Sequence, residues 1–163
     1  MVIEAPTHKT YFEDLSVAHI SDILSIYAER TKVITKNKKI EYVLIFKNEG
    51  DRAGASIMHA HSQIFASSFL PPHLLDKSQK VQEYKLRHGT CVYCNTIAHE
   101  RKTARMVWED AHIIAFTPYA SMHHYEVWIM PKRHIDNVMD LTAKERLSFA
   151  KVLKRLVHKI RGL

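Results

Sequence analysis

The stretch that decides the fold is residues 54–64, which read Gly54-Ala55-Ser56-Ile57-Met58-His59-Ala60-His61-Ser62-Gln63-Ile64. Successive side chains of a strand point to opposite faces, so a strand over residues 56–66 would place His59, His61 and Gln63 on one face. The small residues that precede the histidines would let a phosphate group approach the backbone closely. The other interpretation is an exposed polar face of an ordinary strand. The small residues favour a phosphate-binding site.

Helices and strands are predicted on both sides of this strand. Ser16 precedes an apolar stripe with helical spacing, and a capping box at Thr142 and Glu145 begins another such stripe. Short β-branched and aromatic runs closed by turn residues predict strands. The predicted elements are a helix at 17–31, strands at 42–46, 56–66, 106–108, 112–116 and 126–130, and a helix from 142 to about 160. This pattern predicts an α+β fold with an antiparallel sheet and helices packed on one face.

Length and composition are those of one globular unit. The chain has 163 residues, of which 46% are hydrophobic and 25% are charged, close to the average for soluble domains. It has no apolar run of membrane-spanning length and no secretory signal, so we expect a cytoplasmic protein without a membrane partner. A net charge of +7 favours an anionic partner, either a phosphorylated metabolite or nucleic acid. Nucleic acid is not expected, because the lysine run at 36–39 lacks interleaved aromatic residues.

Cys91 and Cys94 are the only cysteines in the chain. Two cysteines at this spacing are typical of a zinc knuckle, and His134 is the natural third ligand. The alternatives are a redox pair and two simply buried cysteines. A redox pair would require the first cysteine at a helix start after a strand of a thioredoxin-like unit, which the sequence does not indicate. We therefore favour a Zn²⁺ site.

An internal repeat relates the two predicted long helices. Residues 3–8 end at His8 and lead to Asp14-Leu15-Ser16 and a helix. Residues 129–134 end at His134 and lead to Asp140-Leu141-Thr142 and a helix, with the same spacing from the histidine to the cap. The match is short, so chance similarity of two strand–turn–helix units is the alternative. We favour a duplication.

The His59–Gln63 segment resembles the active-site strand of the galactose-1-phosphate uridylyltransferase branch of the histidine-triad superfamily, which has the pattern His-x-His-x-Gln. The hydrolase branch has a third histidine where Gln63 stands. Other segments also resemble this family, and together they cover nearly the whole chain. They are Pro6-Thr7-His8, Asn48-Glu49-Gly50, and Tyr125-Glu126-Val127-Trp128-Ile129 followed by Pro131-Lys132-Arg133-His134.

The resemblance implies a role for each matching residue. His61 would be the nucleophile, and Gln63 would donate a hydrogen bond to the transferred phosphoryl group. Asn48 and Ser56 would contact phosphate or the active site, although a turn-forming Asn and a strand-end Ser account for them equally well. The implied metal ligands, of Cys2His2 sites that hold Zn²⁺, are Cys91, Cys94, His134, His59 and His8.

The implied activity is nucleotidyl transfer between a nucleoside diphosphate sugar and a sugar 1-phosphate or phosphate, through a nucleotidyl-histidine intermediate. The alternatives are a hydrolase or phosphorylase acting on such nucleotides, and a non-catalytic zinc-stabilised binding module. We expect a homodimer. The residues leave open which base and which sugar are bound.

The order of the motifs indicates two incomplete copies of a histidine-triad-like unit. We predict that residues 1–68 are the later part of a first copy, that 69–86 are a linker with Pro71-Pro72 and a helical stretch, and that 87–163 are the earlier part of a second copy. The chain would then be a central fragment of a longer enzyme or a half-length relative. His59 would join either His8 in a separate half-site, which we favour, or Cys91, Cys94 and His134 in one four-ligand site.

Overall fold

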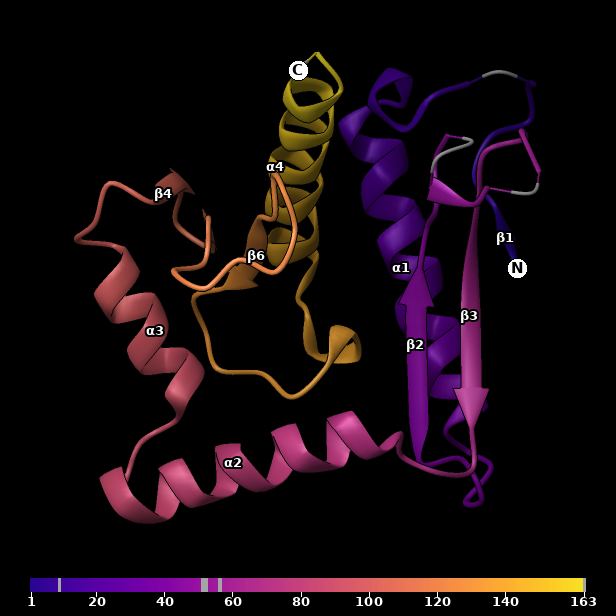
Figure 1. Cartoon of the computed structure of the whole chain (residues 1–163). Helices are drawn as coiled ribbons and strands as arrows, with labels where there is room; N and C mark the ends of the chain where they lie inside the picture. Colours follow the sequence, from indigo (N-terminus) through magenta and orange to yellow (C-terminus); the bar gives the residue numbers. More distant parts are fainter. Residues whose placement is uncertain (9, 51–52, 56, 163) are drawn as a thin grey trace.

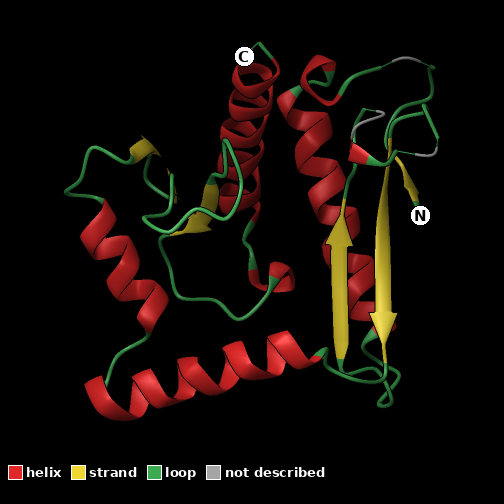
Figure 2. Cartoon of the chain, in the orientation of Figure 1, coloured by secondary structure: helices red, strands yellow, loops and turns green. Residues whose placement is uncertain are grey.

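The computed structural model describes residues 1–8, 10–50, 53–55 and 57–162, and it has an α+β fold (Figures 1 and 2). The strands are β1 (Val2–Ile3), β2 (Tyr42–Phe46), β3 (His61–Ser67), β4 (Met106–Glu109), β5 (Ile113–Phe116) and β6 (Trp128–Pro131). The α-helices are α1 (Val17–Ile34), α2 (Pro72–His88), α3 (Val92–Glu100) and α4 (Ala143–Arg161). Short 3-10 helices, η1 (Phe12–Asp14) and η3 (Val138–Asp140), precede α1 and α4. The predicted fold class is confirmed.

The strands form two three-stranded antiparallel sheets, with the orders β1-β3-β2 and β4-β5-β6. In the first sheet, β3 is the central strand. His61 lies opposite Ile3 of β1, and Gln63 lies opposite Phe46 of β2. The helix α1 covers one face of this sheet (Figure 1). His61 is therefore paired with β1 and Gln63 with β2.

The caps identified in the sequence begin the two long helices. The hydroxyl of Ser16 accepts a hydrogen bond from the backbone N–H of His19 at the start of α1. Thr142 and Glu145 form the predicted capping box at the start of α4, which satisfies backbone donors that the helix itself leaves free. No helix among the described residues is long and apolar enough to cross a membrane.

The strand that carries the motif begins later than predicted. We predicted a strand from Ser56, but β3 begins at His61 and residues 57–60 are irregular. Residues 57–60 have no register partner among the described strands, because β1 pairs with His61 and Ser62 and β2 pairs with residues 63–67. His59 therefore lies before the strand and does not share a strand face with His61 and Gln63.

Two structurally similar units pack through their long helices. In each unit a short strand leads to a 3-10 helix and then to a capped long helix. The helices α1 and α4 contact each other, and each also contacts the 3-10 helix of the other unit, so the contacts are reciprocal. Reciprocal contacts of this kind are expected where two similar units pack about an approximate two-fold axis.

Candidate active site and metal-binding groups

His61 is the first residue of β3, and its side chain is buried, with 5% of its surface exposed. Its Nδ1 lies 2.8 Å from the backbone carbonyl oxygen of His59. A carbonyl oxygen can only accept a hydrogen bond, so this contact places a proton on Nδ1. In the neutral ring, Nε2 then keeps its lone pair, which is the state that a nitrogen nucleophile requires.

A cavity of about 450 Å³ is lined by His61, His59 and Asn48. Lys47 at the end of β2 and Arg161 at the end of α4 line the same cavity. Sequence reasoning missed both residues. The only local signal for Lys47 was its position beside Asn48. Arg161 belongs to the other unit, so nothing in its own neighbourhood connects it with the histidine motif.

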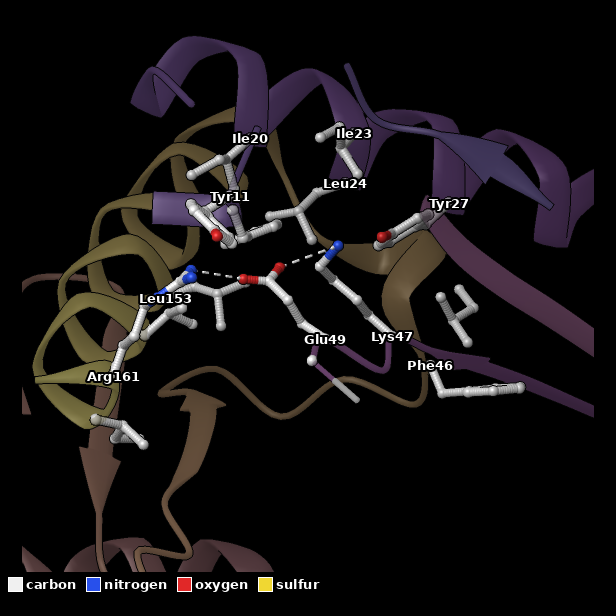
Figure 3. A pocket seen from close by; sticks show the side chains of 15 residues that line it. Tyr11, Ile20, Ile23, Leu24, Tyr27, Phe46, Lys47, Glu49, Leu153 and Arg161 are labelled. Atoms are coloured by element: carbon white, nitrogen blue, oxygen red, sulfur yellow. Dashed lines mark hydrogen bonds and ion pairs between the residues drawn. The ribbon is translucent and has the colours of Figure 1, made fainter. Parts of the chain in front are cut away.

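A second cavity, of about 640 Å³, lies between α1, α4 and the end of β2 (Figure 3). Its wall is mostly apolar, and Lys47, Glu49 and Arg161 line both this cavity and the one at His61. Glu49 forms an ion pair with the Lys47 ammonium at 3.3 Å and accepts a hydrogen bond from the Arg161 guanidinium at 3.1 Å. A row of paired charges therefore borders both cavities.

The other two residues of the predicted substrate site differ in position. Gln63 is half-buried and follows His61 by two residues along β3, so the two side chains share a strand face. Gln63 is not among the described residues that line the 450 Å³ cavity. Ser56 lies outside the described residues. The structure thus brings Asn48 to the cavity of His61 and places Gln63 beside His61 in the strand.

His8 and His59 lie against each other, although they are far apart in the sequence. Their Nδ1 atoms are 2.6 Å apart, and their ring centroids are 4.9 Å apart. The Nε2 of His59 contacts the backbone carbonyl oxygen of Ala5 at 2.6 Å, which requires a proton on that nitrogen. The Nδ1 of His59 is therefore available as an acceptor or as a metal ligand, and it faces His8.

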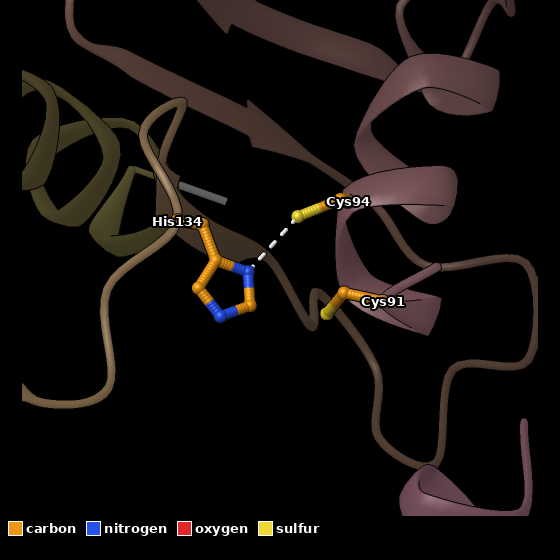
Figure 4. Close-up of side chains that lie close together, drawn as sticks. All are labelled: Cys91, Cys94 and His134. Carbon is orange, nitrogen blue, oxygen red and sulfur yellow. Dashed lines mark hydrogen bonds between the residues drawn. The ribbon is translucent and has the colours of Figure 1, made fainter. Parts of the chain in front are cut away.

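Cys91, Cys94 and His134 form a second group (Figure 4). Cys91 is the N-cap of α3, Cys94 lies in its first turn, and His134 follows β6. One ligand atom from each residue lies within 4.8 Å of the other two, and the Cys94 sulfur is 3.2 Å from the Nδ1 of His134. Two sulfurs and one imidazole nitrogen at such distances fit three corners of a tetrahedral Zn²⁺ site.

The two thiols of this group differ in acidity. Burial opposes ionisation of Cys91, but backbone N–H groups of Cys94 and Tyr93 favour its thiolate and bring its pKa below the ordinary value. Burial and the neighbouring Cys91 raise the pKa of Cys94. Cys91 stands at a helix start, as a redox pair would, but that helix follows α2 and not a strand. The thioredoxin-like context is therefore missing.

The two groups do not converge within this chain. The described cluster around the cysteines contains Cys91, Cys94 and His134, and His59 is not a member of it. His59 instead contacts His8. Figure 1 shows α3 and β3 on opposite sides of the molecule. Within one chain His59 therefore does not lie with Cys91, Cys94 and His134, and the candidate ligands lie in two separate groups.

Two of the solved structures with a similar fold are described as an ADP-glucose phosphorylase and a uridylyltransferase. An ADP-glucose phosphorylase from Arabidopsis thaliana with bound ADP-glucose matches with a TM-score of 0.90 and 30% sequence identity. The match covers 97% of this chain and 50% of that chain. A structure described as a uridylyltransferase matches with a TM-score of 0.87 and 33% identity, over 93% of this chain and 48% of that one.

Family models give the same assignment. Residues 1–71 match the model for the N-terminal domain of galactose-1-phosphate uridyl transferase, and residues 77–163 match the model for its C-terminal domain. The chain belongs to this family. The resemblance found in the sequence is confirmed.

Two curated relatives align with almost the whole chain. ADP-glucose phosphorylase from Arabidopsis thaliana is 32% identical over 98% of this chain and 44% of its own length. Galactose-1-phosphate uridylyltransferase from Thermotoga maritima is 30% identical over 98% of this chain and 50% of its own length. The chain therefore spans about half the length of the curated relatives it matches.

Proposed function

We propose that the protein transfers a nucleoside monophosphate from a nucleoside diphosphate sugar to a sugar 1-phosphate or to phosphate, with His61 as the nucleophile. The observation that carries the proposal is the buried His61 imidazole, whose Nδ1–H donates to the His59 carbonyl and leaves Nε2 free. Membership of the galactose-1-phosphate uridyl transferase family supports the same chemistry.

The transfer divides into two displacements at one phosphorus atom. Nε2 of His61 attacks the α-phosphorus, a nitrogen–phosphorus bond forms, and the bond to the bridging oxygen breaks, so that sugar 1-phosphate leaves with the electron pair. A phosphate oxygen of the acceptor then attacks the same phosphorus and releases the neutral imidazole. A covalent intermediate replaces one difficult step with two easier ones.

Gln63 and Asn48 are proposed to stabilise the phosphoryl group. Gln63 is a neutral donor, so it can bind developing negative charge without activating water as an acid or base would. Asn48 lines the cavity of His61, and its amide can donate to a phosphate oxygen. Ser56 is proposed as a further phosphate contact from the segment before the motif.

Two partial metal groups are proposed to brace this site. Cys91, Cys94 and His134 would hold Zn²⁺ through two sulfurs and one nitrogen, and His8 and His59 would supply two ligands of a second site. Zn²⁺ would act structurally, by fixing the segments that carry its ligands. The remaining ligands would come from outside the present sets. We also propose that the protein is a homodimer, which sedimentation equilibrium can test.

The first experiment measures the covalent intermediate. The protein is incubated separately with UDP-glucose and ADP-glucose, and its intact mass is determined. We expect an acid-labile nucleotide adduct that is absent in His61→Ala. The matched control is His73→Ala, which removes an exposed imidazole at the start of α2 and should leave the adduct unchanged. Adduct formation that survives His61→Ala would overturn the assignment of the nucleophile.

The acceptor separates transfer from its rivals. One of the relatives is an ADP-glucose phosphorylase, so inorganic phosphate is a specific alternative to sugar 1-phosphate. The isolated adduct is mixed with glucose 1-phosphate, galactose 1-phosphate, phosphate or buffer alone. Discharge by a sugar phosphate identifies a transferase, discharge by phosphate a phosphorylase, and rapid loss in buffer a hydrolase. Nucleotide binding without any adduct would identify a binding module.

A further inference from the structure

We propose that Glu4, Lys47 and Tyr27 form a positioning network that holds the start of β3 so that His61 is aligned for attack. The proposal rests on the proposed role of His61 as nucleophile. None of the three residues belongs to the His-x-His-x-Gln motif. They come from the segment after β1, the end of β2 and the middle of α1. They contact one another, and two of them contact the residues that begin β3.

Two contacts connect this network with the nucleophile strand. The Lys47 ammonium lies 3.4 Å from the backbone carbonyl oxygen of His61. The Tyr27 hydroxyl lies 2.7 Å from the hydroxyl of Ser62, the next residue. One contact therefore holds the peptide group of His61, and the other holds the side chain that follows it on the opposite strand face.

Glu4 joins the two holding groups to each other. Its carboxylate accepts from the Lys47 ammonium at 2.7 Å and from the Tyr27 hydroxyl at 3.0 Å. A carboxylate can only accept, so the single Tyr27 proton goes to Glu4, and the Ser62 hydroxyl donates to Tyr27. The backbone carbonyl of Glu4 also contacts Nε2 of His19 at 2.7 Å. Each of these hydrogen bonds thus has a defined donor and a defined acceptor.

The burial of the network indicates a role beyond stability. Glu4 and Ser62 are each only 1% exposed, and burial raises the pKa of Tyr27. Taking a carboxylate and an ammonium out of water costs free energy, and apolar residues of similar volume often give equal or greater stability. An ion pair with its hydrogen bonds orients the groups that it contacts, whereas apolar contacts are non-directional.

The backbone at His61 needs contacts besides those of the sheet to hold it in place. It is the first residue of β3, and the neighbouring β1 has only two residues, so few ladder hydrogen bonds hold this end of the strand. The His61 ring is aimed by its Nδ1 contact with the His59 carbonyl, and that contact depends on the backbone of residues 59–61. Lys47 contacts the same backbone at the His61 carbonyl oxygen.

Lys47 could instead bind the phosphate directly, because it lines the cavity of His61. Its ammonium is already shared between the carboxylates of Glu4 and Glu49 and the His61 carbonyl. Two carboxylates beside one ammonium offset its positive charge and would repel a phosphate group at the same position. We therefore assign Lys47 a positioning role, and the affinity for nucleotide distinguishes it from a phosphate ligand.

The test compares two Lys→Met variants of the whole chain. Lys47→Met removes the contact with the His61 carbonyl. Lys154→Met is the matched control, since the Lys154 ammonium likewise contacts a backbone carbonyl, that of Leu15 at 2.6 Å, away from β3. Tyr27→Phe removes only a hydroxyl and serves as a second variant if Lys47→Met does not fold.

Three quantities are measured for each variant. They are the single-turnover rate of adduct formation, the Kd for ADP-glucose, and the protonation of the two His61 ring nitrogens by ¹⁵N NMR, with the His61 signals assigned by their loss in His61→Ala. We expect Lys47→Met to slow adduct formation about 10- to 100-fold, as a small misplacement of a reacting group does. The Kd should stay within about threefold of wild type. The wild-type signals should show a proton on Nδ1 alone, and Lys47→Met should show a mixture of tautomers.

The outcomes separate this proposal from the proposed function. If the wild type forms no adduct, the role of His61 as nucleophile fails, and the NMR comparison still tests the network. A His61 tautomer and an adduct rate in Lys47→Met that match those of Lys154→Met would overturn the network. So would a large loss of affinity with an unchanged tautomer, which would make Lys47 a phosphate ligand. Tyr27→Phe should shift the tautomer in the same direction.

Discussion

Cys91 is both the N-cap of a helix and a member of the candidate metal-binding group. As the N-cap of α3 it stands at the end of the helix where backbone N–H groups are free, and those groups favour its thiolate. Cys94 lies almost one turn further on, so both sulfurs reach the same side of the helix. The Cys-x-x-Cys spacing therefore brings the two sulfurs close together, because one cysteine caps the helix and the other lies in its first turn.

We expect Cys91→Ser to lose bound zinc and to lower the melting temperature, by roughly 5–15 °C, because metal binding free energy contributes to folding free energy. Metal content is measured by mass spectrometry after purification without added zinc. A chelator should lower the wild-type melting temperature and leave that of Cys91→Ser unchanged. A wild type that is free of metal and as stable as the variant would contradict the proposed site.

At the scale of single residues, the sequence reveals motifs made of neighbouring residues, but it does not reveal contacts between residues that are far apart in the chain. The local spacing at 59–63 singled out the histidine motif, and the family resemblance assigned His61 the role of nucleophile, which stays a prediction. The histidine pair His8 and His59 required the family resemblance, since no local pattern connects them. Lys47 and Arg161 reach the cavity of His61 only through the packing of β2 and α4. Charged residues at such positions look like ordinary surface residues in a sequence.

The turn between β4 and β5 is organised around one carboxylate. Asp110 accepts from the backbone N–H groups of His112 and Ile113, at 2.8 and 2.9 Å, and also from the hydroxyl of Ser148 on α4. Burial opposes its ionisation, but these donors outweigh burial and lower its pKa to about 2. Asp110 thus ties the β4–β5 hairpin to the long helix that covers it.

This lowered pKa predicts a loss of stability in acid. The pKa of Asp110 is about 2 in the folded chain and about 3.9 when unfolded, so the ionised carboxylate stabilises the fold by about 2–3 kcal/mol above pH 4. That contribution is lost as pH falls from about 4 to 2. Urea unfolding should show the free-energy difference between wild type and Asp110→Asn shrinking over this window. A free-energy difference that stays constant between pH 4 and pH 2 would contradict the stabilising role assigned to the Asp110 carboxylate.

At the scale of elements, the starts of the two long helices were predicted more accurately than the start of β3, the strand that carries His61. The caps at Ser16 and Thr142 are local signals, and both long helices begin where the caps predict. The alternation around the histidine motif suggested a strand from Ser56, but pairing with β1 begins at His61 and pairing with β2 begins at Gln63. Strand limits depend on partners, which a single sequence does not display.

The two units of the molecule share one core at their helices. A buried cluster joins Ile20, Ile23 and Leu24 of α1 to Ala150 of α4. Phe149 packs against this cluster and also against a second one under the β4-β5-β6 sheet. The repeat in the sequence spans the strand, 3-10 helix and capped helix of each unit, and its origin in a duplication stays a prediction. It did not predict that their helices would pack against each other, because helix contacts depend on packing geometry that periodicity alone does not specify.

A shared core makes the unfolding of one unit depend on the other. Ile20 is fully buried in α1, and removing most of its side chain should cost about 3–4 kcal/mol. The two tryptophans, Trp108 and Trp128, both belong to the β4-β5-β6 sheet in the other unit. We therefore expect Ile20→Ala to lower the urea midpoint of the tryptophan fluorescence transition, in step with the transition followed by circular dichroism.

The control for this experiment is Ile26→Ala on the same helix, where the side chain is 38% exposed. Because less apolar surface is lost from the core at that position, the midpoint should move by less than about a third as much. If the two units unfolded independently, Ile20→Ala would shift the circular dichroism signal and leave the tryptophan midpoint in place. That result would mean that the helices pack without coupling, and that the segment carrying His61 and the segment carrying the cysteines are separate folding units.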